Sequence, residues 1–497
     1  MWSKWWVLSG VVLLGACGGG GGGAGNALEK TSSELAQICS ASNPLASDAL
    51  SSTRIGTLAD ERQWIKAYLN ERYYWYQDIV PLNAADAAYN VTTSTPSTNF
   101  IQSVVNYFYD QLNPNYTSAG SPVDQFSFMT STESWTQYSQ GSDLGYGWLL
   151  QDSGASSTRR IKVAYVYPSA QSGLAAAAGI LRGDEIISVN GFAVNNTQMS
   201  SAVDGWLSPS TTAVHQFVIQ RGGQTFSVNL RASNTVLPQA EHRVVTDSQQ
   251  VKWGYLLFNG HVDSAQEPLR AALTDFKNQQ VQQLVVDLRY NGGGYLALAS
   301  ALAYGIAGES RTREKTFERI LYNSKRTSSN ENIPFYRVDT DGRSIDTMSL
   351  SKIYVLTTDA TCSASESLIN GLRGVDVEVV QIGGTTCGKP YGFLPQDNCG
   401  ITYAAMEFEG VNHKGQGGYA NGLVPQCAAN DDLTHALGNP NESMFAVAIA
   451  HQRGFACSSV QSSRALSSSS SVSGLGQSSA RIMRSDWHTG KFWRQQK

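Results

Sequence analysis

The sequence predicts an α/β protein in which a β-rich domain and a small helical unit precede the main domain. Three observations lead to this fold class. Apolar strand-like runs alternate with helical runs from about residue 242 to 457. Short strands separated by glycine turns fill about 143–231, and two aromatic helical patterns lie between 60 and 112. With 497 residues, of which 41% are hydrophobic, the chain can form several buried cores.

The N-terminus has the pattern of an export signal. Lys4 precedes an apolar run, Trp5–Leu14, which is too short to span a bilayer. The "LGAC" ending at Cys17 resembles a bacterial lipobox, so residues 1–17 are read as a lipoprotein signal peptide and Cys17 as the lipidated residue. A glycine run opens a tether assigned to residues 18–59. We therefore expect a lipid-anchored protein of the bacterial cell envelope, on the periplasmic or surface side; an ordinary secretory signal is the alternative.

Residues 60–135 are expected to form an N-terminal helical region. In "DERQWIKAYLNERYYWYQDI" and again in "STNFIQSVVNYFYDQL", apolar and aromatic residues recur at helical spacing. Such stripes are typical of core packing rather than of a cofactor site.

Residues 136–235 are expected to form the β-rich domain. "RIKVAYVYP" alternates as a strand does, and "GLAAAAGILRGDEIISVNG" gives a short helix, a turn and a strand that ends at Asn190-Gly191, a hairpin dipeptide. This order resembles a PDZ domain. The resemblance implies a carboxylate-binding loop at "LGYG" and a strand, Trp148–Gln151, along which a peptide can add. A β-domain used only as a spacer is the alternative. The implied peptide-binding residues are Leu144, Gly145, Tyr146 and Gly147.

Residues 236–457 carry the α/β pattern with mainly parallel strands. "VKWGYLLFNG", "QQLVVDLRYNGGG", "SKIYVLTT" and "VEVVQIGG" read as strands, with a helix in "DSAQEPLRAALTDFKNQ". Residues 458–497 are dominated by serine and lack hydrophobic periodicity, so we expect a disordered tail.

Charge and cysteine content narrow the function classes. A formal net charge of −4 does not favour a nucleic acid partner. Without Cys17, six cysteines remain, enough for three disulfides in an oxidising compartment, with 15 possible connectivities. Cys387 and Cys399 are the closest pair in sequence. The absence of a CxxC pair and the scattered histidines argue against a zinc site, and no organic cofactor is implied.

Ser363 lies where a strand, Ile353–Thr357, turns into a helix in "TTDATCSASESLINGLRG". A hydroxyl at this junction faces free helix N–H groups, which suits a nucleophile whose reaction intermediate is an oxyanion. The same pattern is explained by a capping box, with Ser363 as the N-cap and Glu366 three residues later. The stretch contains no histidine to accept a proton.

Two other segments help to decide whether Ser363 is a nucleophile or only a helix cap. "DLRYNGGG" ends a buried strand in a glycine loop, which can bring backbone N–H groups close to a reacting carbonyl. "GGTTCGKPYG" places Lys389 in a glycine-flanked loop after another buried strand. An ordinary tight turn and a solvated surface lysine are the alternatives. Asp287 and Arg289 are interpreted as a structural pair that fixes the glycine loop.

Together with "TCSASESLINGL", these segments resemble, in the same order, the tail-specific (carboxy-terminal processing) serine proteases, over roughly residues 60–455. The resemblance implies a crotonase-like, ClpP-like protease core with an inserted PDZ domain. It implies Ser363 as the nucleophile, Lys389 as the general base and Glu366 as an organising residue. Backbone N–H groups of Ala364 and of a glycine in 292–294 would form the oxyanion hole, with Gly292 and Gly293 as the first candidates.

A lysine base must be neutral, although the free side chain has a pKa of about 10.4. Burial away from charge lowers that pKa, so Lys389 is expected in a mostly apolar pocket. The expected substrate is an exported polypeptide bound by its C-terminus. A catalytically inactive peptide-binding lipoprotein with the same fold, and acyl-group chemistry on small substrates, are the alternative functions.

Overall fold

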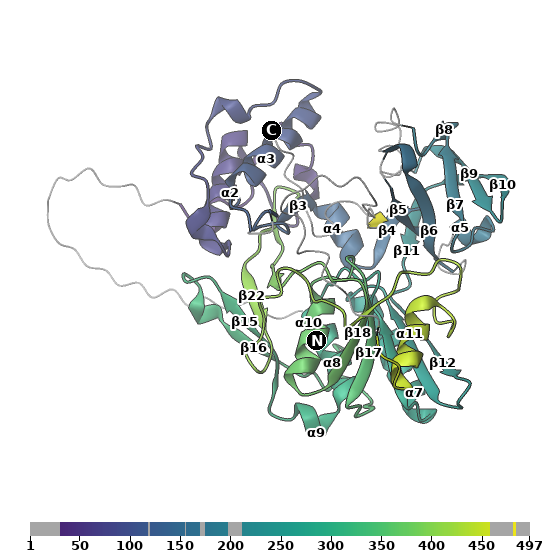
Figure 1. The fold of residues 1–497 in the computed structure, drawn as a ribbon. Coiled ribbons are helices and arrows are strands. Elements are labelled where there is room, and N and C mark those ends of the chain that lie inside the picture. The colour runs from purple at the N-terminus through teal and green to yellow at the C-terminus, as the bar shows by residue number, and fades with distance from the viewer. Residues whose placement is uncertain are drawn as a thin grey trace, which may run out of the picture.

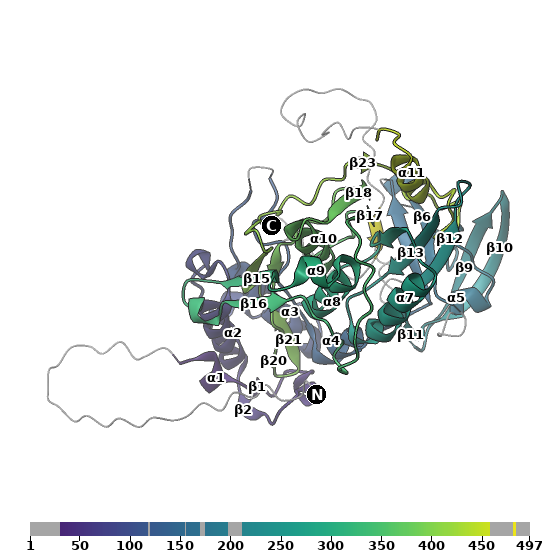
Figure 2. The ribbon, with the colours of Figure 1, turned by 90° about the horizontal axis from the view of Figure 1, so that it is seen from below.

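The computed structural model describes residues 30–117, 120–154, 156–168, 174–196, 211–457 and 481–483. The predicted signal and Cys17 lie outside these ranges. Within them, no helix is both long and apolar enough to cross a bilayer. The described chain forms an α/β core with a helical unit and a β-rich unit at its two sides (Figures 1 and 2).

The core is built on a six-stranded sheet in which all strands from β13 to β23 run parallel and β12 is antiparallel at one edge. Its central strands carry buried apolar runs, as expected for strands covered on both faces. In spatial order the strands are β12 (Ala240–Thr246), β13 (Lys252–Phe258), β14 (Gln283–Asp287), β17 (Lys352–Thr357), β18 (Glu378–Gly383) and β23 (Cys427–Ala428).

Helices cover both faces of this sheet. The largest apolar cluster lies on one face, under α7 (Gln266–Asn278), α8 (Leu296–Ala307) and α10 (Ala364–Gly374). The other face is covered by α11 (Ser443–Gln452), whose Phe445 stacks on Tyr255, and by side chains of the β-rich unit. The helix predicted in "DSAQEPLRAALTDFKNQ" is α7, and the four strands predicted for this domain are β13, β14, β17 and β18.

Two smaller sheets extend the core. One has the order β16-β15-β22-β19 and follows the short helix α9 (Glu309–Thr312); the other has the order β20-β21-β3 and reaches the helical unit. Their strands are β15 (Thr316–Tyr322), β16 (Glu331–Pro334), β19 (Tyr391–Gly392), β22 (Phe408–Val411), β20 (Gln396–Asn398), β21 (Ile401–Ala404) and β3 (Phe128–Ser131).

The helical unit contains the two helices that the sequence predicts, α2 (Leu58–Arg72) and α3 (Pro96–Gln111), with buried aromatic stripes that pack on β21. The tether predicted over residues 18–59 is wrong for residues 32–56, because this stretch folds into a helix and two strands of the unit. A disulfide between Cys39 and Cys399 ties this unit to the core. Its other elements, and α4, which leads to the β-rich unit, are α1 (Ser32–Leu35), β1 (Ile38–Ser40), β2 (Arg54–Gly56) and α4 (Thr132–Ser139).

We call residues 142–236 the β-unit. Its sheet has the order β10-β9-β7-β6-β5, and the predicted hairpin dipeptide Asn190-Gly191, with positive φ at both residues, joins β7 to β8. The elements are β4 (Ser142–Gly145), β5 (Trp148–Ser153), β6 (Arg160–Val166), α5 (Leu174–Ala177), β7 (Glu185–Val189), β8 (Phe192–Ala193), β9 (Val214–Arg221), β10 (Gln224–Arg231) and β11 (Ser233–Val236).

The prediction of a wholly disordered tail is wrong for three residues. Arg481–Met483 form the strand β24, which pairs antiparallel with β5 and appears as the short yellow segment beside β5 (Figure 1). The remaining tail residues, 458–480 and 484–497, lie outside the described chain.

Candidate active site

The three sequence segments singled out above meet at one edge of the core sheet. β14, β17 and β18 are adjacent and parallel, so the loops that follow them leave from the same side. The first loop contains Asn291–Gly294, the second ends at Ser363, and the third contains Lys389. The topology therefore brings Ser363, Lys389 and the glycine loop to one place.

Ser363 is held in a backbone conformation that L-residues rarely adopt, with φ of 56° and ψ of −119°. Such a conformation costs on the order of 1–3 kcal/mol and persists only where the surroundings enforce it. Hydrogen bonds hold the turn on both sides: the Glu366 carboxylate accepts the Ser363 N–H at 3.0 Å, and Asn291 O accepts the Cys362 N–H at 3.1 Å. The turn presents Ser363 half-buried at the start of α10.

Gly293 packs directly against this turn. A Cβ atom at Gly293 would lie 2.7 Å from the Ser363 Cβ and 2.9 Å from the Cys362 carbonyl oxygen, and its φ is +106°. Only glycine fits at this position. The Gly293 N–H donates to Asn291 Oδ1 at 2.9 Å, so this N–H is already used within the loop.

The remaining N–H groups around Ser363 are open. Within the described chain, the backbone N–H groups of Gly292, Gly294 and Ala364 donate in no hydrogen bond. Ala364 is the first residue of α10, where the helix dipole favours a negative charge. Of the predicted oxyanion donors, Gly292 and Ala364 are free to act, whereas Gly293 serves as the close contact.

Lys389 is only 5% exposed and lies in an apolar pocket. Its Nζ is 4.9 Å from the ring centroid of Phe393 and 5.4 Å from that of Phe126. Burial lowers the pKa of Lys389 to about 8, while the charges of Asp124 and Glu366 oppose the shift. A group with this pKa is substantially neutral at slightly alkaline pH and can accept a proton.

Asp124 and Phe126 were not found by sequence reasoning. Both come from the segment between α3 and β3, far from Lys389 in sequence. The Asp124 carboxylate accepts the Tyr73 hydroxyl at 2.7 Å and the N–H groups of Phe126 and Ser127 at 2.9 Å. These bonds fix the carboxylate near Lys389. No local sequence motif predicts this arrangement.

Glu366 connects the nucleophile turn to the lysine loop. Its fully buried carboxylate accepts the backbone N–H groups of Gly388 at 2.9 Å and Lys389 at 2.8 Å, in addition to that of Ser363, and the Thr386 hydroxyl also donates to it. Burial raises the pKa of Glu366 and the donated hydrogen bonds lower it, with burial the larger effect. The capping box predicted for Ser363 and Glu366 is thus present, and the same carboxylate also orders the base loop.

A disulfide joins the same two loops. Cys362 precedes Ser363, and its partner Cys387 lies two residues before Lys389; their Cα atoms are 5.2 Å apart. The third pair is Cys427–Cys457. The pairing Cys387–Cys399, which sequence proximity allows, does not form, because Cys399 pairs with Cys39 instead.

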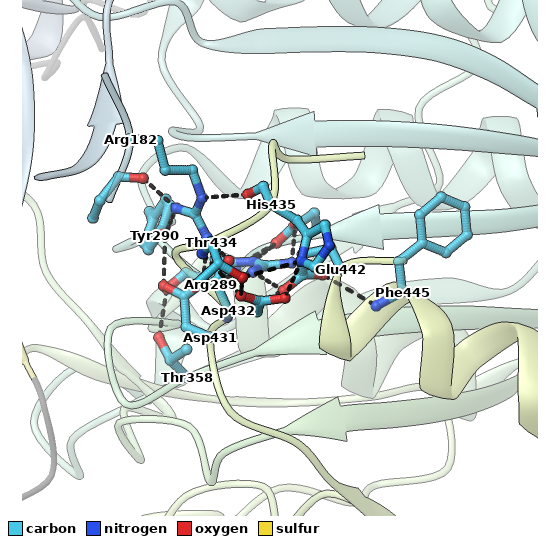
Figure 3. A network of polar contacts seen from close by, with 12 residues as sticks. Arg182, Arg289, Tyr290, Thr358, Asp431, Asp432, Thr434, His435, Glu442 and Phe445 are labelled. Carbon is cyan, nitrogen blue, oxygen red and sulfur yellow. Dashed lines mark hydrogen bonds and ion pairs between the residues drawn. The ribbon is translucent and has the colours of Figure 1, made fainter. Parts of the chain in front are cut away.

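A buried polar network surrounds Arg289 and Tyr290, the residues that lead into the glycine loop (Figure 3). Arg289 is fully buried and pairs with Asp287 at 2.8 Å, as the sequence predicts, and also with Asp431 at 2.7 Å and Glu442 at 2.8 Å. The Thr358 hydroxyl, in the nucleophile turn, donates to Arg289 O. This network therefore supports both the glycine loop and the turn that leads to Ser363.

The β-unit reaches into the same network through Arg182. Its guanidinium pairs with Asp431 at 2.6 Å and donates to the Tyr290 hydroxyl at 2.6 Å (Figure 3). Tyr290 in turn donates to Asp431, and it immediately precedes Asn291. A continuous chain of charged contacts thus links the β-unit to the glycine loop.

The predicted peptide-binding loop joins β4 to β5 in the β-unit. Tyr146 is buried, Gly147 has a φ of +79°, and within the described chain their N–H groups form no backbone hydrogen bond. Their carbonyl oxygens accept the N–H groups of Ala175 and Tyr167. Leu144 and Gly145 pair with β11, whereas Tyr146 and Gly147 lie beyond that pairing.

Residues 252–396 match the family model of peptidase family S41, and this range contains both Ser363 and Lys389. A stretch of 218 residues is 25% identical to the carboxy-terminal processing protease CtpB of Bacillus subtilis (strain 168) and covers 43% of this chain. The same stretch spans 41% of the length of CtpB. Residues 252–396 are therefore similar to peptidase family S41, and part of the chain is similar in sequence to a carboxy-terminal processing protease.

One solved structure shares the fold, and a second match is weaker. The crystal structure of a candidate S41 protease from Bacteroides fragilis NCTC 9343 gives a TM-score of 0.59 at 22% identity, over 79% of this chain and 97% of the other. The photosystem II D1 C-terminal processing protease gives a TM-score of 0.45 at 18% identity, over 78% of this chain and 95% of the other.

Proposed function

We propose that the protein is a serine endopeptidase in which Ser363 is the nucleophile and Lys389 the general base. The observation that carries this proposal is the meeting of the two residues in an S41 domain, with Ser363 on a strained turn and Lys389 buried at a pKa of about 8. The Glu366 carboxylate and the Cys362–Cys387 disulfide support it, because both fix one loop to the other.

The chemistry follows from these positions. Neutral Lys389 takes the proton of the Ser363 hydroxyl as Oγ attacks the peptide carbonyl carbon. The N–H groups of Ala364 and Gly292 stabilise the oxyanion of the tetrahedral intermediate. The Lys389 ammonium then protonates the leaving amine, which leaves an acyl group on Ser363. Water, deprotonated by Lys389, hydrolyses this ester and restores both side chains.

The substrate is proposed to be an exported polypeptide held by its C-terminus at the β-unit. Support comes from the open N–H groups of Tyr146 and Gly147, which suit a carboxylate, and from the adjacent strand β5, which can accept an added strand. The relative CtpB is named for carboxy-terminal processing. The contacts of Arg182 give binding at the β-unit a physical route to the glycine loop.

The location is proposed from the N-terminal sequence. Cys17 would carry the lipid, and the protein would act on the periplasmic or surface side of a bacterial membrane. Metabolic labelling with an alkyne fatty acid tests this: labelling that disappears in Cys17→Ala supports the anchor, and labelling that persists contradicts it.

Cleavage of an unfolded protein tests the function. Residues 26–497, which retain every described residue, are incubated with reduced, alkylated casein, beside Ser363→Ala and Lys389→Ala. Both variants should lose activity by at least about a thousandfold. Ser329→Ala and Lys315→Ala change exposed or partly exposed residues remote in sequence from these loops and serve as controls. Activity that survives both substitutions contradicts the dyad, and an inactive parent favours the peptide-binding scaffold.

A further inference from the structure

The β-unit already has a strand on the edge proposed to bind peptides. β24 pairs antiparallel with β5, with Arg481 opposite Asp152, Ile482 opposite Gln151 and Met483 opposite Leu150. Without β24, β5 would be the last strand of its sheet, and its outward N–H and C=O groups would be unpaired. The chain therefore satisfies this edge with its own residues.

Side chains as well as backbone hold this strand. Ile482 is only 8% exposed and belongs to the apolar cluster that joins the β-unit to the core sheet. Met483 packs against the β-unit cluster that contains Trp148 and Leu150. Arg481 is exposed. Successive side chains of β24 thus point to opposite faces of the sheet, as in any β-strand.

β24 runs along β5 in the direction expected for a bound peptide. From Arg481 to Met483 the chain runs along β5 from Asp152 towards Leu150, and so towards the loop at Tyr146 and Gly147. A peptide whose C-terminal carboxylate reached those N–H groups and which paired antiparallel with β5 would need the same positions. The two cannot pair with this edge of β5 together.

We propose that Arg481–Met483 is a built-in ligand of the β5 edge, which polypeptide substrates must displace. The inference rests on the proposed function in that this edge receives the substrate. The strand belongs to the same chain, so its local concentration is set by the connection to Cys457 and not by the protein concentration. Three of the described residues of the tail pair with β5, and a substrate strand that pairs over a greater length of β5 can displace them.

Peptide affinity tests the displacement. The probe is a fluorescein-labelled peptide of residues 479–485, SARIMRS, and binding to the full chain is measured by anisotropy. Every protein carries Ser363→Ala so that the probe stays intact. Ile482→Asp, which removes the buried anchor of β24, should bind the probe at least tenfold more tightly than the parent. Arg481→Ala, at the exposed position, should stay within twofold of the parent.

Equal affinity of the parent and Ile482→Asp, or no binding by either, would overturn the proposal. Hydrogen exchange provides a second measurement: protection of β5 amides should fall in Ile482→Asp while protection of β6 and β7 remains. A dimer that grows with protein concentration and vanishes in Ile482→Asp would also overturn it, because the strand would then come from a second copy. Failure of the protease proposal is distinguishable, since it shows as absent cleavage with Ser363 intact and leaves the binding difference unchanged.

Discussion

The Glu366 carboxylate accepts the backbone N–H of Lys389 at 2.8 Å, and through the same group it holds the N–H of Ser363 at 3.0 Å. One buried acid thus sets the distance between the nucleophile turn and the base loop. It does so through backbone groups, which leaves the Lys389 side chain free of a direct carboxylate hydrogen bond among the described contacts.

Glu366→Gln should lower kcat strongly while the protein still folds. All the groups around the carboxylate are donors, so the amide nitrogen of glutamine would face at least one N–H without an acceptor, at a cost of about 1–3 kcal/mol. Small misplacement of Lys389 would lower kcat by about a hundredfold. Steady-state kinetics and a melting curve measure the two effects. Unchanged kcat in a folded variant would show that this carboxylate does not order the site.

Activity should rise with pH as Lys389 loses its proton. Because the neutral amine is the base, kcat/KM should rise through an apparent pKa of about 8 and fall tenfold per pH unit well below it. The Asp124 charge raises the pKa of Lys389, so Asp124→Asn should shift the profile to lower pH. A midpoint near the pKa of an ordinary histidine, unmoved by Asp124→Asn, would contradict the lysine base.

Loss of the disulfide beside the dyad should affect activity, whereas loss of a distant one should not. Cys362→Ala with Cys387→Ala removes a link of sequence separation 25, and Cys427→Ala with Cys457→Ala removes one of separation 30. By loop length both should cost about 2–4 kcal/mol of stability. Only the first should lower kcat in the folded protein, as measured well below the melting temperature. Equal kcat values in the two variants would show that both disulfides stabilise the fold and that neither affects catalysis.

Arg182→Ala should weaken the coupling between the β-unit and the site. The change removes one partner of Asp431 and the donor to Tyr290, next to the glycine loop. We expect kcat to fall at least about tenfold while affinity for the peptide probe is kept. Arg159→Ala, which breaks a pair confined to the β-unit, is the matched control. If affinity for the peptide probe changes while kcat is retained, Arg182 contributes to peptide binding and does not couple the β-unit to the active site.

Local patterns predicted much of this molecule. The aromatic stripes gave α2 and α3, and the apolar runs gave the parallel strands that carry the site loops. The Asp287–Arg289 pair was predicted because both residues lie at the end of a buried strand. Its wider partners, Asp431 and Glu442, lie more than 140 residues away and give no local signal.

The remaining features depend on long-range contacts. Asp124 and Phe126 reach Lys389 only through the folded chain, and six cysteines permit too many pairings for sequence to select one. The strand Arg481–Met483 has no periodicity of its own, because its order comes from the open edge of β5. The serine-rich sequence around it therefore led to the prediction of a disordered tail.

Covalent labelling tests the central claim most directly. The folded protein is treated with a fluorophosphonate serine probe at about one pH unit above the pKa of Lys389, where the amine is largely neutral, and the adduct is mapped by mass spectrometry. We predict one adduct, on Ser363, that is lost in Lys389→Ala and in denatured protein. An adduct on another serine, or labelling of Ser363 that is unchanged in Lys389→Ala, would contradict the account.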